Sequence, residues 1–232
     1  MTFYPQSRIT FKGEHRLHDR LNTLLVVNQS MVMACYYLIK GRATFAEGET
    51  ASHQCRQLNI KVRLPIFGPL EAALGARYPD KISVTFEECV IEGPYNEWAA
   101  GLGRSGPIYY GLMSAAPHIA ANTFVEFYEA FSDFIYDKYG KVKNWPAFWR
   151  FARVVRNSIS HGGKVAIDNE KDEPVEWYGL RYSFANRGHP IIGVPFADLN
   201  VGDLIVLMFE MNDFLDAEGC PIELSASAER PR

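Results

Sequence analysis

The stretch from Phe148 to Gly163, FWRFARVVRNSISHGG, restricts the fold of this chain more than any other part of it. At about 100° per residue, its apolar side chains fall within an arc of roughly 100°, which predicts an amphipathic helix with one buried side. These side chains are Phe148, Phe151, Ala152, Val155 and Ile159. Pro146 is suited to the first turn of this helix, and the glycine pair at its other end predicts where it stops.

Three further stretches have apolar residues at helical spacing. They predict long helices over residues 14–40, 119–139 and 200–219, and a glycine follows or closes each of them. Residues 41–117 contain LPIFGP and EGPY, a short helical pattern and the strand-like segment KISVTFEECVI, in which Ile82, Val84 and Phe86 share one side. We expect this region to be an irregular α/β insertion.

After the amphipathic helix that begins near Pro146 and ends before Gly162 (the motif helix), the spacing of the apolar residues changes. The segments VEWYGLRYSF and HPIIGVPF alternate like strands, so residues 174–197 are expected to form a small β-hairpin joined through ANRG. The expected fold class is therefore mainly α: a helical bundle of about four long helices that carries the insertion and the hairpin. Because these regions are interleaved along the chain, residues 1–232 are expected to form a single domain.

Composition limits the classes of function. With 47% hydrophobic and 22% charged residues the chain is globular, and its net charge of −3 argues against a protein that coats nucleic acid through overall charge. We find no apolar leader and no uninterrupted membrane-spanning stretch, and the four cysteines form no C-x-x-C pair. We expect a cytoplasmic protein with reduced thiols, no membrane association and no zinc knuckle.

The side of the motif helix opposite its apolar residues is polar and basic. Arg150, Arg153, Asn157 and His161 lie within an arc of about 80° on that side, with Ser160 beside them and Arg156 toward one edge. From residue 141 to residue 164 there are six basic residues and no acidic one. This asymmetry indicates a local site for a polyanion. The alternative is a solvated basic helix face that ends in a C-capping histidine, because cations favour helix C-termini.

The position of His161 suits proton transfer. In the last helical turn, the negative end of the helix dipole favours the protonated imidazole, whereas a nearby arginine disfavours it. The balance between these opposing effects decides whether His161 suits acid–base work near neutral pH, and His161 is a candidate for that role.

The segment RNSISH, Arg156 to His161, resembles the Arg-x(4–6)-His signature of the HEPN superfamily (higher eukaryotes and prokaryotes nucleotide-binding), in which a polar residue often follows the arginine. That residue is Asn157 here. The resemblance implies an all-helical bundle with the motif near the end of a late helix. Catalytic members are metal-independent ribonucleases that act as dimers, with two motifs facing each other, in toxin–antitoxin, phage-defence and RNA-processing systems.

Carried over to this chain, the resemblance implies a homodimeric endoribonuclease of a toxin–antitoxin or phage-defence system. It makes Arg156 the phosphate-binding and transition-state-stabilising residue, His161 the proton-transfer residue and Asn157 a polar support. It implies no metal and no cofactor, and its partners would be RNA, a second copy of the chain and an antitoxin or regulatory protein. The basic side of the helix adds candidate RNA contacts at Arg150, Arg153, Ser160 and Lys164, and Trp149 at its edge is a candidate for base stacking.

Two other interpretations stay open. One is a HEPN-like module that binds a nucleotide, RNA or protein partner without cleaving it, and the other is a structural or regulatory helical protein with a chance motif. The match to G-x-G-x-x-G at residues 101–106 does not follow a buried strand, so it predicts a glycine loop rather than a dinucleotide site. His15 and His18 are interpreted as surface residues rather than metal ligands, and the acidic residues between 168 and 176 as a solvated loop.

Overall fold

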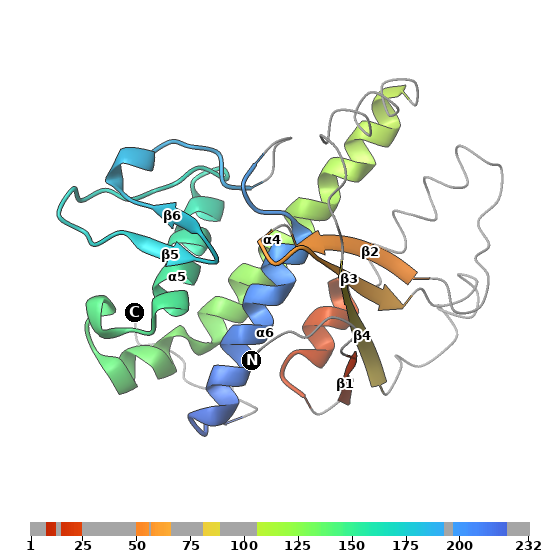
Figure 1. Cartoon of the computed structure of the whole chain (residues 1–232), viewed down its shortest axis with the longest axis horizontal. Coiled ribbons are helices and arrows are strands. Elements are labelled where there is room, and N and C mark those ends of the chain that lie inside the picture. Colours follow the sequence, from red (N-terminus) through yellow and green to blue (C-terminus); the bar gives the residue numbers. More distant parts are fainter. Residues whose placement is uncertain are drawn as a thin grey trace, which may run out of the picture.

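The computed structural model describes residues 8–12, 15–24, 50–55, 57–65, 81–88, 106–192 and 197–221, and the structural statements below refer to these. Helices dominate, accompanied by two small antiparallel sheets (Figure 1). The long helices are α4 (Gly106–Tyr139), α5 (Ala147–Ser160) and α6 (Val201–Ala217), and residues 18–24 are also helical. Short 3-10 turns, η1 (Val142–Asn144) and η2 (Phe184–Asn186), connect other elements.

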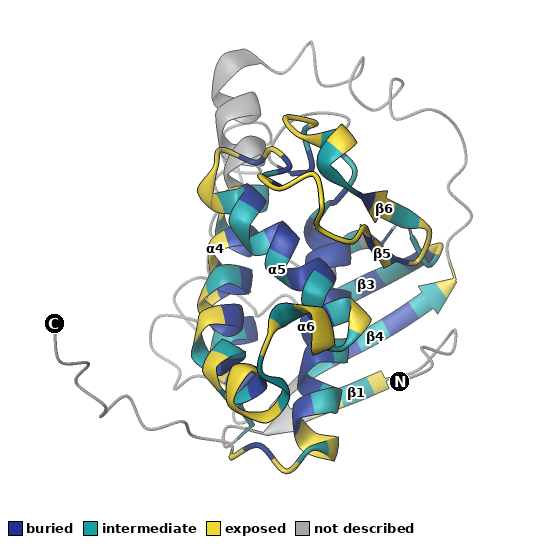
Figure 2. Ribbon diagram, turned by 90° about the vertical axis from the view of Figure 1, so that its left-hand side faces the viewer, coloured by how far each residue is buried: buried dark blue, intermediate teal, exposed yellow. Residues whose placement is uncertain are grey.

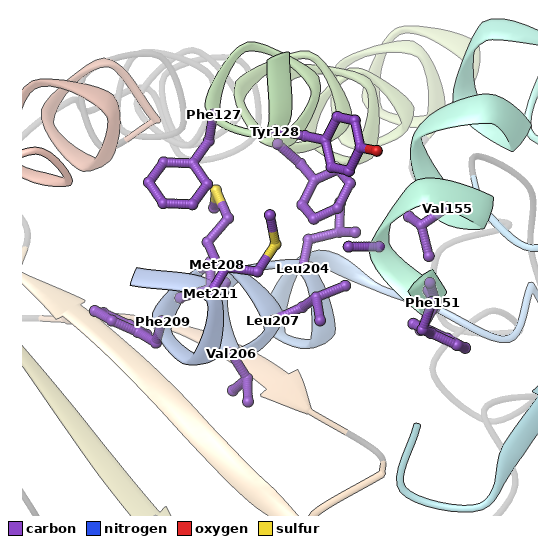
Figure 3. Packing of buried hydrophobic residues seen from close by; sticks show 14 of the residues in the cluster. Phe127, Tyr128, Phe151, Val155, Leu204, Val206, Leu207, Met208, Phe209 and Met211 are labelled. Atoms are coloured by element: carbon purple, nitrogen blue, oxygen red, sulfur yellow. The ribbon is translucent and has the colours of Figure 1, made fainter. Parts of the chain in front are cut away.

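Helix α6 is the central element of the core. Every residue from Val201 to Phe209 is buried, as expected for a helix that is apolar on all sides. Met208 and Met211 point toward Phe127 of α4, whereas Val206 and Phe209 point toward the strands (Figure 3). The start of α6 is capped by Asn200, whose side chain accepts from the backbone N–H groups of residues 202 and 203 at 2.9 and 3.2 Å. The sequence prediction of this helix is confirmed.

A four-stranded antiparallel sheet covers the other side of α6. Its strands are β1 (Arg8–Lys12), β2 (Thr50–Cys55), β3 (Ile60–Pro65) and β4 (Lys81–Glu88), in the order β1-β4-β3-β2. Val84 and Phe86 of β4 are fully buried, and the ring of Phe86 meets that of Phe209 at 5.5 Å between centroids. The predicted strand in KISVTFEECVI is confirmed.

The prediction of an irregular insertion over residues 41–117 is wrong for the part that the structure describes. Strands β2, β3 and β4 form a regular sheet with β1, which precedes the region and was not predicted, and the last residues of the region belong to α4. The sequence pattern placed the end of this region at Pro117, and proline lacks the N–H needed inside a helix. Helix α4 continues through Pro117, where alanines on both sides favour helix formation.

The predicted hairpin over residues 174–197 is also wrong in its extent. The hairpin pairs β5 (Val175–Trp177) with β6 (Leu180–Tyr182), and its turn is Tyr178–Gly179, not ANRG. Both turn residues have positive φ, +44° and +84°, which is the geometry of a tight turn that follows the strand twist. The residues after η2 pair with the end of the motif region instead, since Lys164 and Pro190 form an isolated β-bridge.

Helix α5 packs against α4, α6 and β5. Figure 2 shows that α5 carries both buried and less buried residues. Its burial confirms three of the five predicted core residues, Phe151, Ala152 and Val155, whereas Phe148 and Ile159 are half-buried. The buried side is turned to include Trp149, Val154 and Ser158. Of the predicted helix over 14–40, the structure describes residues 15–24, of which 18–24 are helical. Residues 101–105 of the glycine loop lie outside the described residues.

Candidate functional site

The motif helix ends in a well-defined glycine cap. The N–H of Gly163 donates to the carbonyl of Ser158 at 2.8 Å and the N–H of Gly162 donates to that of Ile159 at 3.2 Å, the pair of bonds that defines a Schellman motif. Both glycines have positive φ, +74° and +79°. His161, the residue after α5, is exposed, and its imidazole makes no hydrogen bond to any described residue. The prediction that α5 stops at this glycine pair is confirmed.

The glycine cap is held in place by a later segment of the chain. The carbonyl of Gly163 accepts from the N–H of Ile191 at 2.8 Å, and the N–H of Val165 donates to the carbonyl of His189 at 2.9 Å. The Asp198 carboxylate in turn accepts from His189 Nε2 at 2.9 Å and from the Tyr182 hydroxyl at 2.8 Å. Residues 188–192 therefore support the glycine cap next to His161, and Asp198 supports His189 in turn.

Arg156 is held by contacts on two sides. Its Nε donates to the Glu129 carboxylate of α4, and its Nη1 donates to the Asn157 amide oxygen at 3.2 Å. The side chains of Arg156 and Glu129 are 35% and 45% exposed, so this ion pair lies at the surface. Asn157 therefore contacts the arginine side chain directly.

The other predicted RNA contacts differ in their surroundings. Ser160 is exposed, and its hydroxyl donates to the Arg156 carbonyl at 3.3 Å. Lys164 is exposed beyond the glycines, and Arg153 is half-buried on the same helix. Arg150, in contrast, forms an ion pair at 2.9 Å with Glu173 of the acidic loop. That carboxylate offsets the charge of Arg150, which lies nearly three helical turns before His161. Arg153, Arg156, Asn157, Ser160 and His161 therefore form the core of the site.

The predicted role of Trp149 in base stacking is wrong. Its side chain is 0% exposed and lies 5.7 Å from the Tyr128 ring between centroids. A base cannot reach a ring that is enclosed by protein. The helical projection placed Trp149 at the edge of the polar side, but packing of α5 against α4 turns that edge inward.

Helix α4 contributes residues to the site that were not predicted. Glu129 contacts Arg156, and the Tyr128 hydroxyl lies within electrostatic range of Arg153 and Arg156. Burial raises the pKa of Tyr128 above its ordinary value, so the hydroxyl stays neutral and can act as a hydrogen-bond donor. The exposed acidic residues of α4 recur at helical spacing in the sequence, but spacing within one helix does not show which helix lies opposite.

We also searched the described residues for a candidate metal site. They contain no group of three or more His, Cys, Asp and Glu side chains able to hold a metal ion. His18 is buried rather than at the surface, which corrects that prediction, and its Nδ1 lies 3.1 Å from Asp19. Cys55 and Cys220 are buried and free, while Cys35 and Cys89 lie outside the described residues. No helix within the described ranges is both long and apolar enough to cross a membrane.

Comparison of the chain with protein-family models, with curated proteins and with solved structures gave no match. The site is therefore interpreted from its own geometry: an exposed imidazole, a guanidinium held by two neighbours, and further cations on one end of a helix. Such a group can bind a phosphodiester and move protons beside it.

Proposed function

We propose that this chain is a metal-independent endoribonuclease of HEPN type that acts as a homodimer. The observation that carries the proposal is the exposed His161 at the end of α5, one and a half helical turns beyond Arg156, in a region rich in cations. If the tip of α5 were buried, the motif would have no access to RNA. Its exposure supports the proposal.

The proposed reaction needs only groups of this chain and the RNA. The 2′-oxygen attacks the adjacent phosphorus, an O2′–P bond forms, and the P–O5′ bond breaks. The products are a 2′,3′-cyclic phosphate and a 5′-hydroxyl. One imidazole accepts the 2′-hydroxyl proton and another supplies a proton to the leaving 5′-oxygen. Arg156 stabilises the negative oxygens of the transition state.

The need for two imidazoles favours a dimer, because each chain supplies one His161 to the site. The surface formed by α4 and α5 carries both acidic and basic residues, which supports a two-fold interface, since one patch must then complement itself. Glu129, Asp133 and Asp137 are exposed on one side of α4, and Glu129 contacts Arg156 on the basic side of α5. A two-fold axis that sets each acidic side against the partner's basic side would bring the two motif ends together.

The test is cleavage of labelled single-stranded RNA in EDTA by the native protein, His161→Ala and Arg156→Ala. We expect cleavage by the native protein alone, with a cyclic phosphate product, and no cleavage of an RNA whose 2′-hydroxyls are replaced by hydrogen. Arg187→Ala is the matched arginine control, because Arg187 is 57% exposed and paired with Asp168 at the surface. Sedimentation should show a dimer. Cleavage that requires magnesium, or that persists in both motif variants, would refute the proposal.

A module that binds RNA without cleaving it is the second candidate. The ion pair between Arg156 and Glu129 favours it, because the carboxylate already offsets part of the positive charge that Arg156 would need to stabilise a transition state. This candidate predicts RNA binding that weakens in Arg156→Ala, with no product from the native protein in the same assay.

A further inference from the structure

The ion pair between Glu129 and Arg156 connects α4 to the motif, and Glu129 stands 27 residues before Arg156 in the chain. The carboxylate accepts from Nε of the guanidinium, and Asn157 accepts from Nη1 at 3.2 Å. Within the described part of the chain, Nη2 has no hydrogen-bond partner. The two contacts fix the plane of the guanidinium and leave a terminal nitrogen available.

Stability alone does not account for this arrangement. Both side chains of the pair are more than a third exposed, and an ion pair in such a position contributes little to the free energy of folding. An unrestrained arginine samples many rotamers, however, and a residue that binds a transition state has to be oriented before the reaction. The contact therefore has more effect on the geometry of Arg156 than on the fold.

We propose that Glu129 is a positioning residue for the ribonuclease reaction: it holds Arg156 by Nε and so presents the terminal guanidinium nitrogens to the phosphate. This inference rests on the proposed function. It also predicts that the negative charge of Glu129 has two opposite effects on the reaction. The charge orients the arginine, but it also repels the RNA backbone in the bound ground state.

Removal of the carboxylate should therefore change kcat and affinity in opposite directions. In Glu129→Ala we expect kcat to fall about tenfold or more, because a misplaced group loses its transition-state contact. The Kd of a non-cleavable 2′-deoxy-substituted oligonucleotide should stay unchanged or decrease. Glu129→Gln keeps an oxygen that accepts from Nε, so its kcat should recover to within about threefold of the native value.

Glu126→Ala is the matched control, because Glu126 is an exposed carboxylate one turn earlier on α4 with no hydrogen bond to Arg156. It removes the same charge and should leave kcat within about twofold of the native value, as expected for a surface change away from the contact. An NMR measurement reports on the contact without activity. The Nε–H resonance of Arg156 should be shifted and protected from solvent exchange in the native protein and in Glu126→Ala, but not in Glu129→Ala.

The outcomes separate the two proposals. A native protein that cleaves no RNA overturns the proposed function and with it the role of Glu129. Native cleavage with an unchanged kcat in Glu129→Ala overturns the role of Glu129 alone. A joint loss of kcat, RNA binding and thermal stability in Glu129→Ala shows general damage and also overturns it. An Nε–H resonance that Glu129→Ala leaves in place shows that the contact does not hold Arg156.

Discussion

Gly163, at the end of the motif helix, should tolerate a side chain far less well than its neighbour Gly162. A Cβ built on Gly163 would lie 2.3 Å from the carbonyl oxygen of Ile192, whereas one on Gly162 would meet nothing within 4 Å. Both residues have positive φ, so both substitutions by alanine carry the backbone cost, about 1 to 2 kcal/mol for an L-residue. The collision adds a second cost only at Gly163.

The size of the second cost follows from what has to move. The obstacle is backbone, and the N–H of Ile192 already donates to the Gly163 carbonyl at 3.3 Å, next to the 2.8 Å bond from Ile191. Relief of the collision disturbs these bonds, and overpacking of this kind costs about 1 to 3 kcal/mol. Gly163→Ala should therefore be about 2 kcal/mol less stable than Gly162→Ala. For a chain of this size, that difference lowers the melting temperature by about 4 to 8 °C.

The measurement is the free energy of unfolding of both variants by urea titration, together with their melting temperatures. Each variant serves as the control for the other, since residue type, helix end and sign of φ are the same. Equal destabilisation of the two variants would refute the reasoning, because it would mean that residues 188–192 do not lie against Gly163.

Three further predictions concern the core. Burial lowers the pKa of His53 to about 4, so the unfolded chain binds an additional proton between pH 4 and about 6.5. Stability should be complete above that range and fall by about 3 kcal/mol through it, and His53→Gln should remove this slope. Burial raises the pKa values of the Cys55 and Cys220 thiols, so iodoacetamide at pH 8 should label both only after denaturation, as read by mass spectrometry. Arg16→Met removes a 2.8 Å bond to the Cys220 carbonyl and an ion pair with Asp216, and should lower the free energy of unfolding by about 2 kcal/mol.

Each of these three predictions would be contradicted by a specific experimental result. A pH slope that survives in His53→Gln would assign the effect to other groups. Rapid labelling of Cys55 in the native protein would contradict its burial at the end of β2, the strand that packs against α6. An Arg16→Met variant as stable as the native protein would show that the buried guanidinium contributes no net stability, as happens when an apolar residue of similar size replaces a buried charge without loss.

The candidate site could be predicted from the sequence in part. The end of α5 and the polar side that carries His161 depend on residues within one or two helical turns, and a helical projection with a glycine stop places them well. The same projection failed for Trp149, because a residue at the edge of the polar side is buried or exposed according to the helix that lies beside it.

In the fold, too, the elements that were predicted depend on their own residues, and those that were missed depend on distant or weak signals. Strand β4 and helix α6 were predicted from the alternation and the unbroken apolar run of their own residues, whereas β1 was missed because its pairing partner, β4, lies about 70 residues later in the chain. The hairpin was misplaced because Tyr178–Gly179 is a weaker turn signal than Asn-Gly or Asp-Gly.

The sequence by itself determined where the motif helix runs and stops and which of its residues carry charge, because helical period and glycine conformation are local properties of the chain. Only the tertiary structure decided that Glu129 lies opposite Arg156, that Trp149 is enclosed, and that residues 188–192 brace the glycine cap. These contacts join segments far apart in the chain. They depend on how two surfaces pack together, and neither surface alone contains that information.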